Sequence, residues 1–222
     1  MACVKLNQNE ELRQSAKSKS YYCRYRKDII EMIPPDTKRV LSVGCASGIT
    51  EQELVKRGIK VDGVELNHEA AEAAKKRGLN VFEGDVSEIE IDTDNGQYDL
   101  IIYADILEHL PDPVNILQRH LRYLKSGGYI FVSVPNFRYY SIFWKLFIRG
   151  QIKYSNAGIL DRTHLRITTR KMVLDWFDEV GLIPVSWKYQ ILGRRNKLLS
   201  ACLLGTAKEF LANIIICIGR KP

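Results

Sequence analysis

The chain has 222 residues, of which 45% are hydrophobic, and carries a formal net charge of +7 at pH 7. This length supports one hydrophobic core, so we expect a single domain over residues 1–222. The polar N-terminal segment lacks an apolar signal core, which argues against a secretory signal. The five cysteines are an odd number, and they fit a reducing cytoplasm better than a disulfide framework.

Apolar runs of strand length alternate with helical patterns along most of the chain. The predicted strands are residues 39–43, 61–65, 80–83, 98–103, 128–134, 183–190 and 213–219. Helical patterns fill residues 50–57, 67–77, 112–126 and 168–180. This alternation indicates βαβ units, a doubly wound and mostly parallel sheet, and ligands bound at the carboxyl ends of the strands. The expected fold class is therefore α/β and Rossmann-like.

The turn after the first predicted strand, Gly44 to Gly48, indicates a ligand site. It lacks the glycines of a G-x-G-x-x-G dinucleotide fingerprint, and the chain has no G-x-x-x-x-G-K-[ST] run for a nucleoside triphosphate. Backbone N–H groups before a helix can face a ligand at close range. Glu65 ends the second predicted strand, about 20 residues later, where a carboxylate can hold both hydroxyls of a ribose. These features predict an adenosine-type cofactor.

Four segments in the same order resemble class I S-adenosylmethionine (SAM) dependent methyltransferases. They are the glycine turn, Gly84-Asp85-Val86, the strand and loop from Tyr98 to Leu110, and the turn and strand from Leu124 to Asn136. Residues 158–182 are similar to methyltransferases that modify sugars and small metabolites, and residues 134–150 are similar to MetW-like proteins. The resemblance implies SAM as cofactor and a seven-stranded sheet whose last strand is antiparallel.

The resemblance also implies the cofactor-binding residues. These are Gly44, Cys45, Ala46, Ser47, Gly48, Glu65, Leu66, Asp85, Val86 and Ala104. Two positions depart from the family pattern. Ser42 stands where the family usually has an acidic residue near the methionine amino group, so a charge is missing there. Ala46 replaces the middle glycine, which is acceptable if its φ is negative.

The loop after the fourth predicted strand is the expected place of the chemistry. Methyl transfer from a sulfonium is an in-line displacement, and a base helps only when the acceptor must lose a proton. His109 is the best candidate base, since its ordinary pKa lies near neutrality. Asp105 and His164 are the other catalytic candidates. The alternative is that His109 only forms part of a helical turn.

Metal binding is the alternative function of this loop. On a helical turn Asp105, Glu108 and His109 would share one face, and with His164 they would suit Mg²⁺ or Mn²⁺. Metal-dependent methyltransferases of RNA 3′ ends and of ubiquinone precursors have a similar E-x-x-E-H pattern. Here the first residue is a shorter Asp, and similar segments occur in metal-free relatives, so we expect no metal.

Two segments outside the strand–helix alternation are assigned to cover the site. Residues 1–36 are expected to form an N-terminal helical cap, with Tyr21, Tyr22 and Arg26 near the methionine end of the cofactor. Residues 137–167 are expected to form an insertion that acts as a lid over the acceptor. Its aromatic residues, edged by basic ones, also fit contact with a membrane surface or ordinary packing against the sheet.

We therefore expect a cytoplasmic SAM-dependent methyltransferase that acts on a hydroxyl of a small molecule, a sugar or a related metabolite. Acidic or lipid-linked acceptors fit the positive charge and the insertion. RNA is not the expected partner because no RNA-binding module is appended, and Lys208 and Glu209 argue against a membrane span in residues 198–218. The alternatives are a metal-dependent O-methyltransferase of RNA 3′ ends or a quinol precursor, and a non-catalytic SAM-binding regulator of the MetW-like kind.

Overall fold

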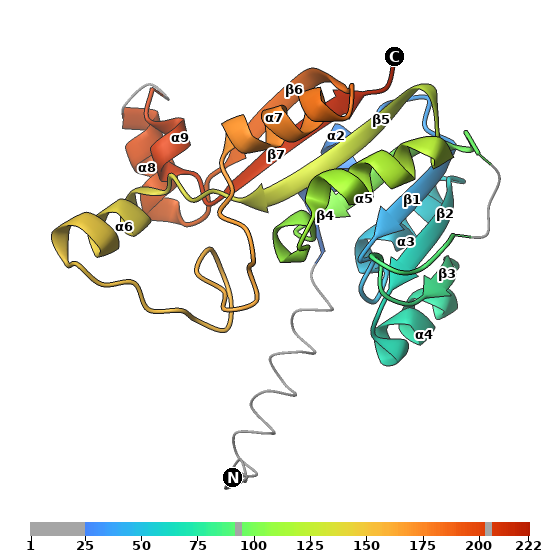
Figure 1. The fold of residues 1–222 in the computed structure, drawn as a ribbon, viewed down its shortest axis with the longest axis horizontal. Helices are drawn as coiled ribbons and strands as arrows, with labels where there is room; N and C mark the ends of the chain where they lie inside the picture. The colour runs from blue at the N-terminus through green and yellow to red at the C-terminus, as the bar shows by residue number, and fades with distance from the viewer. Residues whose placement is uncertain (1–24, 92–94, 203–205) are drawn as a thin grey trace, which may run out of the picture. The chain divides into compact units, whose positions relative to one another are not determined.

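The computed structural model describes residues 25–91, 95–202 and 206–222 (Figure 1). The chain divides into two compact units, residues 1–89 and 90–222, which we call the N-terminal and C-terminal units. Seven strands form a sheet in the order β3-β2-β1-β4-β5-β7-β6. The predicted α/β, Rossmann-like and mostly parallel sheet is confirmed.

In the N-terminal unit, parallel strands alternate with helices. Its elements are α2 (Lys27–Met32), β1 (Arg39–Val43), α3 (Ile49–Lys56), β2 (Lys60–Glu65), α4 (His68–Lys76) and β3 (Asn80–Glu83). β2 pairs in parallel with both β1 and β3. Val40, Leu41 and Val43 are buried, as expected for a parallel strand covered on both faces. The side chain of Asn67 accepts the N–H of Ala70 at 2.9 Å and so begins α4, as its sequence position predicts.

The C-terminal unit contains the parallel pair and the antiparallel edge of the sheet. Its elements are β4 (Tyr98–Ala104), η1 (Leu107–His109), α5 (Pro113–His120), η2 (Leu121–Tyr123), β5 (Leu124–Pro135), α6 (Tyr140–Phe143), η3 (Trp144–Ile148), α7 (Arg170–Glu179), β6 (Ile183–Gln190), α8 (Arg194–Cys202), α9 (Lys208–Leu211) and β7 (Ile214–Arg220). β4 and β5 are parallel, whereas β7 is antiparallel to both β5 and β6. The predicted antiparallel last strand is therefore confirmed.

The core of the C-terminal unit positions the loop after β4. Tyr98, Tyr103, Phe131 and Phe177 are almost completely buried between the sheet and its helices. α7 contacts α5, β6 and β7. β5 begins at Leu124, four residues before the predicted start, because Leu124 is buried and pairs with Tyr98 ahead of an irregularity in the β4–β5 register.

Two further expectations concern the N-terminal cap and the apolar C-terminal segment. Residues 1–24 of the predicted 1–36 cap, Tyr21 and Tyr22 among them, lie outside the described residues, while residues 27–32 form α2. In the described part of the chain, no helix has both the length and the apolar character needed to cross a membrane. The apolar stretch after residue 198 instead forms parts of α8, α9 and β7.

Candidate active site

The turn between β1 and α3 directs its backbone donors into the protein. The N–H groups of Gly44 and Cys45 donate to the carbonyl of Val64 at 2.8 and 3.2 Å, and that of Gly48 donates to the carbonyl of Cys45 at 2.9 Å. The N–H of Ala46 donates to a buried carboxylate at the end of β2, at 2.8 Å. The sequence predicts that N–H groups of this turn face a ligand, whereas these four donate to acceptors within the protein. Binding a phosphate would require N–H groups that are free to donate to it. The turn therefore suits a nucleoside ligand without a phosphate.

The same turn requires left-handed backbone at three positions. Gly44, Ala46 and Gly48 have φ values of +70°, +50° and +71°. The negative φ that would make alanine acceptable at position 46 is not found: the reversal between β1 and α3 holds Ala46 where only glycine is free of strain. At Gly48 an added Cβ would lie 3.0 Å from the Cβ of Ala74, so glycine also permits the close approach of α3 and α4.

Glu65 lies at the end of β2 and is buried. Its carboxylate accepts the N–H of Ala46 at 2.8 Å and that of Asn67 at 2.9 Å. These two bonds fix the carboxylate, and its oxygens keep lone pairs for further donors such as ribose hydroxyls. Leu66, the next residue, leaves 70% of its surface exposed. A large apolar side chain is thus uncovered beside the fixed carboxylate, as a purine ring would require.

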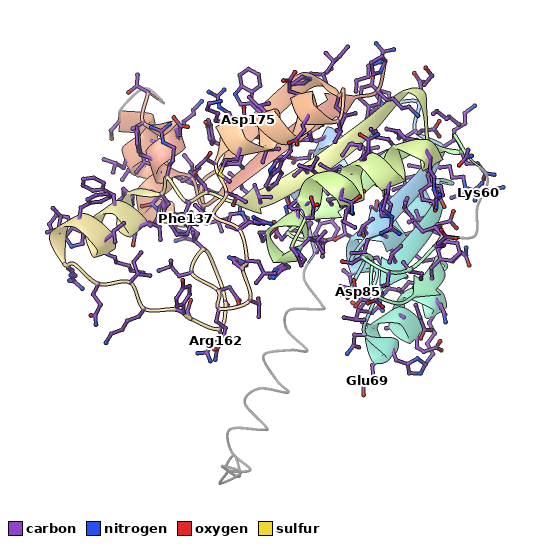
Figure 2. All side chains as sticks on the ribbon, in the orientation of Figure 1. Lys60, Glu69, Asp85, Phe137, Arg162 and Asp175 are labelled. Carbon is purple, nitrogen blue, oxygen red and sulfur yellow. The ribbon has the colours of Figure 1, made fainter. Side chains whose placement is uncertain are left out.

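Asp85 and Val86 follow β3, within the same unit. Asp85 is exposed (Figure 2), and its carboxylate accepts the N–H of Ser87 at 2.7 Å, which closes a tight turn after the strand. Val86 is half-buried. An aspartate held in this way keeps acceptor capacity for the amino group of a base.

A buried carboxylate also lies beside Ser42, and the sequence analysis missed it. The Ser42 hydroxyl donates to Glu51 Oε1 at 2.8 Å, and Glu51 is 5% exposed. Burial raises the pKa of Glu51, against the lowering effects of the Ser42 hydroxyl and the charge of Arg26. Burial and the charges of Glu51 and Glu65 also raise the pKa of the Cys45 thiol, so both carboxylates lie near the turn.

Glu51 therefore offers a carboxyl group where Ser42 has none, from α3 rather than from β1. The only sign of this in the sequence is an acidic residue in the first turn of the helix after the glycine turn.

In the C-terminal unit, Asp105 follows β4 with a φ of +58°. Its N–H donates to the carbonyl of Ser133 at 3.0 Å, and its carboxylate accepts the Ser133 hydroxyl at 2.8 Å. Ala104, the residue before it, is half-buried and pairs with Ser133 in the β4–β5 register. Asp105 thus precedes η1 and is tied to β5, so the shared helical face expected for Asp105, Glu108 and His109 does not form.

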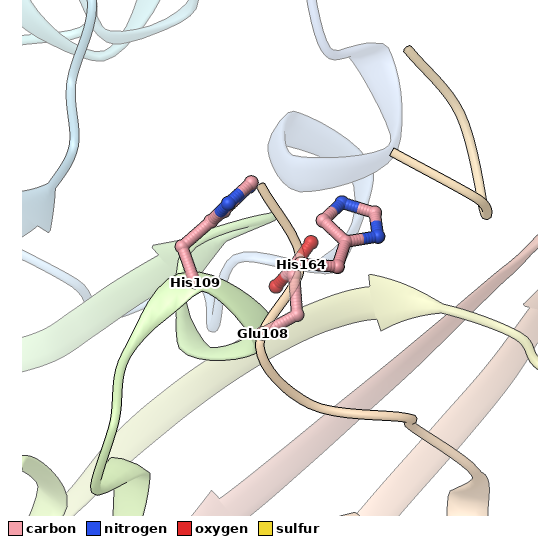
Figure 3. Close-up of side chains that lie close together, drawn as sticks. All are labelled: Glu108, His109 and His164. Carbon is pink, nitrogen blue, oxygen red and sulfur yellow. The ribbon is translucent and has the colours of Figure 1, made fainter. Parts of the chain in front are cut away.

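Glu108, His109 and His164 come together after β4 (Figure 3). One potential ligand atom from each lies within 4.8 Å of the others, and the two imidazole centroids are 4.8 Å apart. The loop that bears His164 is fixed there because the N–H groups of Leu165 and Arg166 donate to the carbonyl of Glu108 at 2.9 and 3.1 Å. A buried acid and two partly buried histidines form this cluster.

The hydrogen bonds of the two histidines define which nitrogen is basic. Nδ1 of His109 lies 3.2 Å from the carbonyl of Thr163, and Nδ1 of His164 lies 3.1 Å from that of Ile159. A carbonyl only accepts, so each Nδ1 carries the proton and each neutral ring keeps its lone pair on Nε2. Burial lowers the pKa of His109. His109 is therefore neutral at pH 7 and can accept a proton or bind a metal.

Fold and site together define an α/β protein for a nucleoside cofactor, with a histidine–carboxylate cluster at the end of β4. The family model described as "Methyltransferase domain" matches residues 16–186. The chain therefore belongs to this family of methyltransferase domains. The buried Glu65, and a turn whose N–H groups donate within the protein, are compatible with a nucleoside cofactor that carries no phosphate.

Single proteins that resemble the chain were found by sequence and by structure. The chain is 32% identical over 104 residues to a "Ubiquinone biosynthesis O-methyltransferase" of Shewanella pealeana, which covers 45% of this chain and 44% of that protein. It is 30% identical over 122 residues to the protein of the same name in Hydrogenovibrio crunogenus, covering 53% and 51%. The chain thus spans about half the length of these curated relatives. A SAM-dependent methyltransferase of Archaeoglobus fulgidus shares the fold, with a TM-score of 0.65, 17% identity and coverage of 92% and 94%.

Proposed function

We propose that this protein transfers the methyl group of SAM to a hydroxyl of a small-molecule acceptor. The observation that carries this proposal is the cluster of Glu108, His109 and His164 beyond the end of β4, in which each histidine Nδ1 contacts a carbonyl and each Nε2 carries the ring's lone pair. The relatives named ubiquinone biosynthesis O-methyltransferase support an oxygen acceptor. A sugar or related metabolite and a quinol precursor are both small hydroxyl acceptors, and they form the panel to test.

Residues of the N-terminal unit would hold the cofactor, which supplies an electrophilic methyl group on a sulfonium. Glu65 would accept the ribose hydroxyls, and Leu66 with Asp85 and Val86 would frame the adenine. Glu51, supported by Ser42, would bind the ammonium of the methionine moiety. Gly44, Cys45, Ala46, Ser47 and Gly48 would line the turn, which approaches the ligand closely because it is tight and carries no large side chain.

Residues of the C-terminal unit would act on the acceptor. His109 Nε2 would take the proton of the acceptor hydroxyl as the oxygen attacks, while its Nδ1–H stays on the carbonyl of Thr163. His164 would orient the acceptor, and Asp105, fixed by Ser133, would accept a second hydroxyl. Ala104 would lie on the cofactor side of the same loop. The insertion 137–167 would close over the acceptor as a lid.

The test measures transfer of a labelled methyl group from SAM to catechols, quinols and sugars. We expect His109→Gln to lower turnover about 10² to 10⁴-fold on the accepted substrate, because the base is lost. His68→Gln changes an exposed histidine on α4 and is the matched control. Equal turnover for His109→Gln and wild type would contradict the assigned base. Cofactor binding without transfer to any acceptor would favour the non-catalytic, MetW-like alternative.

A second candidate is the same transfer with a divalent cation, and one observation favours it. Glu108, His109 and His164 place one carboxylate and two imidazole donors within 4.8 Å of one another. Neutral imidazoles with Nδ1–H groups on carbonyls are typical metal ligands. The two nitrogens suit Mn²⁺ better than Mg²⁺. The ion would bind the acceptor hydroxyl and favour its ionised form.

Calorimetry with Mn²⁺ and activity after chelation separate the two candidates. In the metal-dependent case, Mn²⁺ binds wild type and not His164→Ala, and a chelator abolishes transfer until Mn²⁺ is restored. In the metal-free case, Mn²⁺ shows no specific binding and chelation leaves turnover unchanged. His68→Ala removes one member of the exposed group His68, Glu72 and Glu83, and so shows whether any Mn²⁺ binds there instead.

A cytoplasmic location is part of the proposal. Among the described residues Cys45, Cys202 and Cys217 are free thiols, which is typical of reducing compartments. Burial raises the pKa of the Cys217 thiol to about 12, so this thiol stays protonated and inert. RNA is not proposed as a partner.

A further inference from the structure

One helical segment of the C-terminal unit is exposed over most of its surface. α6 and η3 continue as one helix over residues 140–148, and every residue from 143 to 150 is exposed. The exposed residues include five large apolar side chains, namely Phe143, Trp144, Leu146, Phe147 and Ile148. Proteins in water rarely leave such a contiguous apolar run uncovered unless it binds something.

The base of this helix is firmly held. Ile142 is buried, the Tyr139 hydroxyl accepts from the Asn196 amide at 2.9 Å, and Arg138 forms an ion pair with Glu209 at 2.8 Å. Figure 1 shows α6 at the same end of the unit as α8 and α9. The helix is therefore attached to the unit at its start, while its apolar residues point into solvent.

The charged residues of this segment all have one sign. Residues 137–160 contain Arg138, Lys145, Arg149 and Lys153 and no acidic residue. Lys145 is the only polar residue between Phe143 and Ile148, and Arg149 follows them. Long basic side chains at the edge of an apolar helical surface can bury their stems and keep their charges at phosphate level. This composition is typical of helices that lie in a membrane interface.

We propose that the α6 face, which we define as residues 143–149, binds the surface of a bilayer that contains anionic lipids. The apolar side chains would enter the headgroup region, and Lys145 and Arg149 would contact lipid phosphates. A helix of nine residues is about 13 Å long, against a hydrocarbon core of about 30 Å, so it would lie in one leaflet. If the proposed methyl transfer also holds, this contact places the enzyme beside acceptors that are themselves held in a bilayer.

Two other occupants fit the α6 face less well. A symmetric contact with a second copy would bring Lys145 and Arg149 of both copies into one interface, where residues 137–160 supply no acidic partner for them. RNA would find stacking partners in Trp144 and Phe147 but none for Leu146 and Ile148. A lipid surface matches both the aliphatic side chains and the charge.

The three tryptophans of the chain provide the test. Trp144 and Trp187 are 51% and 50% exposed, and Trp176 is buried, so Trp187→Phe leaves Trp144 as the exposed reporter. With vesicles of phosphatidylcholine and phosphatidylglycerol, we expect its emission to shift to the blue and to be quenched by brominated lipid. Phosphatidylcholine alone and high salt should weaken both effects. Trp144→Phe, which keeps Trp187 on β6, should show neither.

A second test introduces a negative charge into the apolar surface. Phe147→Glu should weaken vesicle binding at least about tenfold, because it places an anion in the apolar surface. Ile183→Glu puts the same charge on an exposed apolar position of β6 and should leave binding within about twofold. No spectral change with anionic vesicles would overturn the proposal. So would quenching that follows Trp187, binding of an RNA oligonucleotide without vesicle binding, or dimers that form in place of vesicle binding. These readouts need no SAM, so they are independent of methyl transfer.

Discussion

At the scale of single residues, the turn after β1 contains backbone strain at a known position. Ala46 has a φ of +50°, where an L-residue with a Cβ is destabilised by about 1–2 kcal/mol. Ala46→Gly should therefore leave stability unchanged or raise it by up to about 1 kcal/mol, after the entropy cost of glycine is subtracted. Ala73→Gly, in the ordinary helical turn of α4, should instead cost about 1 kcal/mol. Urea unfolding followed by circular dichroism gives both values, and equal losses would contradict the assigned strain.

Glu51 is the residue-scale test of how the cofactor's amino acid end is bound. Glu51→Gln should weaken binding of S-adenosylhomocysteine roughly tenfold or more, because a buried charge that would pair with the ammonium is removed. Binding of 5′-methylthioadenosine, which lacks the amino acid, should change by less than about twofold. Glu53→Gln on the same helix is the control. Equal losses for both ligands would mean that Glu51 acts on the turn and not on the ammonium.

At the scale of elements, residues 137–167 are held at both ends, where they leave β5 and where they reach α7. The Asn136 side chain is fully buried and donates to the carbonyls of Glu209 and Ala212 at 2.6 and 2.9 Å. The N–H of Phe137 donates to the carbonyl of Thr168 at 2.9 Å. Both ends of the insertion are therefore tied to the base of β5 and β7, although its middle is exposed.

Asn136→Ala should lower the free energy of unfolding by about 2–3 kcal/mol, since one buried and one partly buried carbonyl lose their donor. The variant should also loosen the insertion, so that amide exchange increases relative to wild type more in residues 137–167 than in β4. Asn115→Ala, at an exposed position of α5, should change stability by less than about 0.5 kcal/mol. A stability loss without faster exchange in the insertion would show that Asn136 does not hold that segment.

The elements also show how far the sequence could be interpreted. All seven strands overlap the apolar runs that predicted them, although β5 begins earlier. The runs are clearest in β1 and β4, because buried parallel strands require them. Glu65 was assigned to the end of β2 from spacing alone. The positive φ of Asp105, the Ser42–Glu51 bond and the Nδ1 contacts of the histidines could not be predicted, because each depends on a partner from another element. The exposure of residues 143–150 depends on tertiary packing, which no local pattern reports.

At the scale of the whole molecule, a buried histidine makes stability depend on pH. His120 is 1% exposed, and its Nδ1 lies 2.7 Å from the hydroxyl of the buried Tyr103. Burial, with the charges of Arg119 and Arg122, lowers the pKa of His120 from 6.5 to about 4. The unfolded chain therefore binds this proton at higher pH than the folded one does. Stability is full above about pH 6.5 and is lost as the pH falls toward 4.

The full loss from His120 amounts to about 3 kcal/mol. Denaturant unfolding monitored by tryptophan fluorescence measures it, since Trp144, Trp176 and Trp187 all lie in the same unit as His120. The double variant Tyr103→Phe/His120→Leu removes the titrating ring and its partner together, and it should lose stability less steeply over this range. An identical pH dependence in wild type and variant would show that His120 is not the acid-sensitive group.

Calorimetry with S-adenosylhomocysteine decides whether the turn after β1 and Glu65 bind an adenosine cofactor. We predict a dissociation constant on the order of micromolar for wild type. Glu65→Ala should weaken binding about 100-fold, since two hydrogen bonds to a charged group are lost. Glu69→Ala, an exposed acidic residue of α4 (Figure 2), should bind like wild type. No binding by wild type, or equal binding by Glu65→Ala, would contradict the assignment of this site.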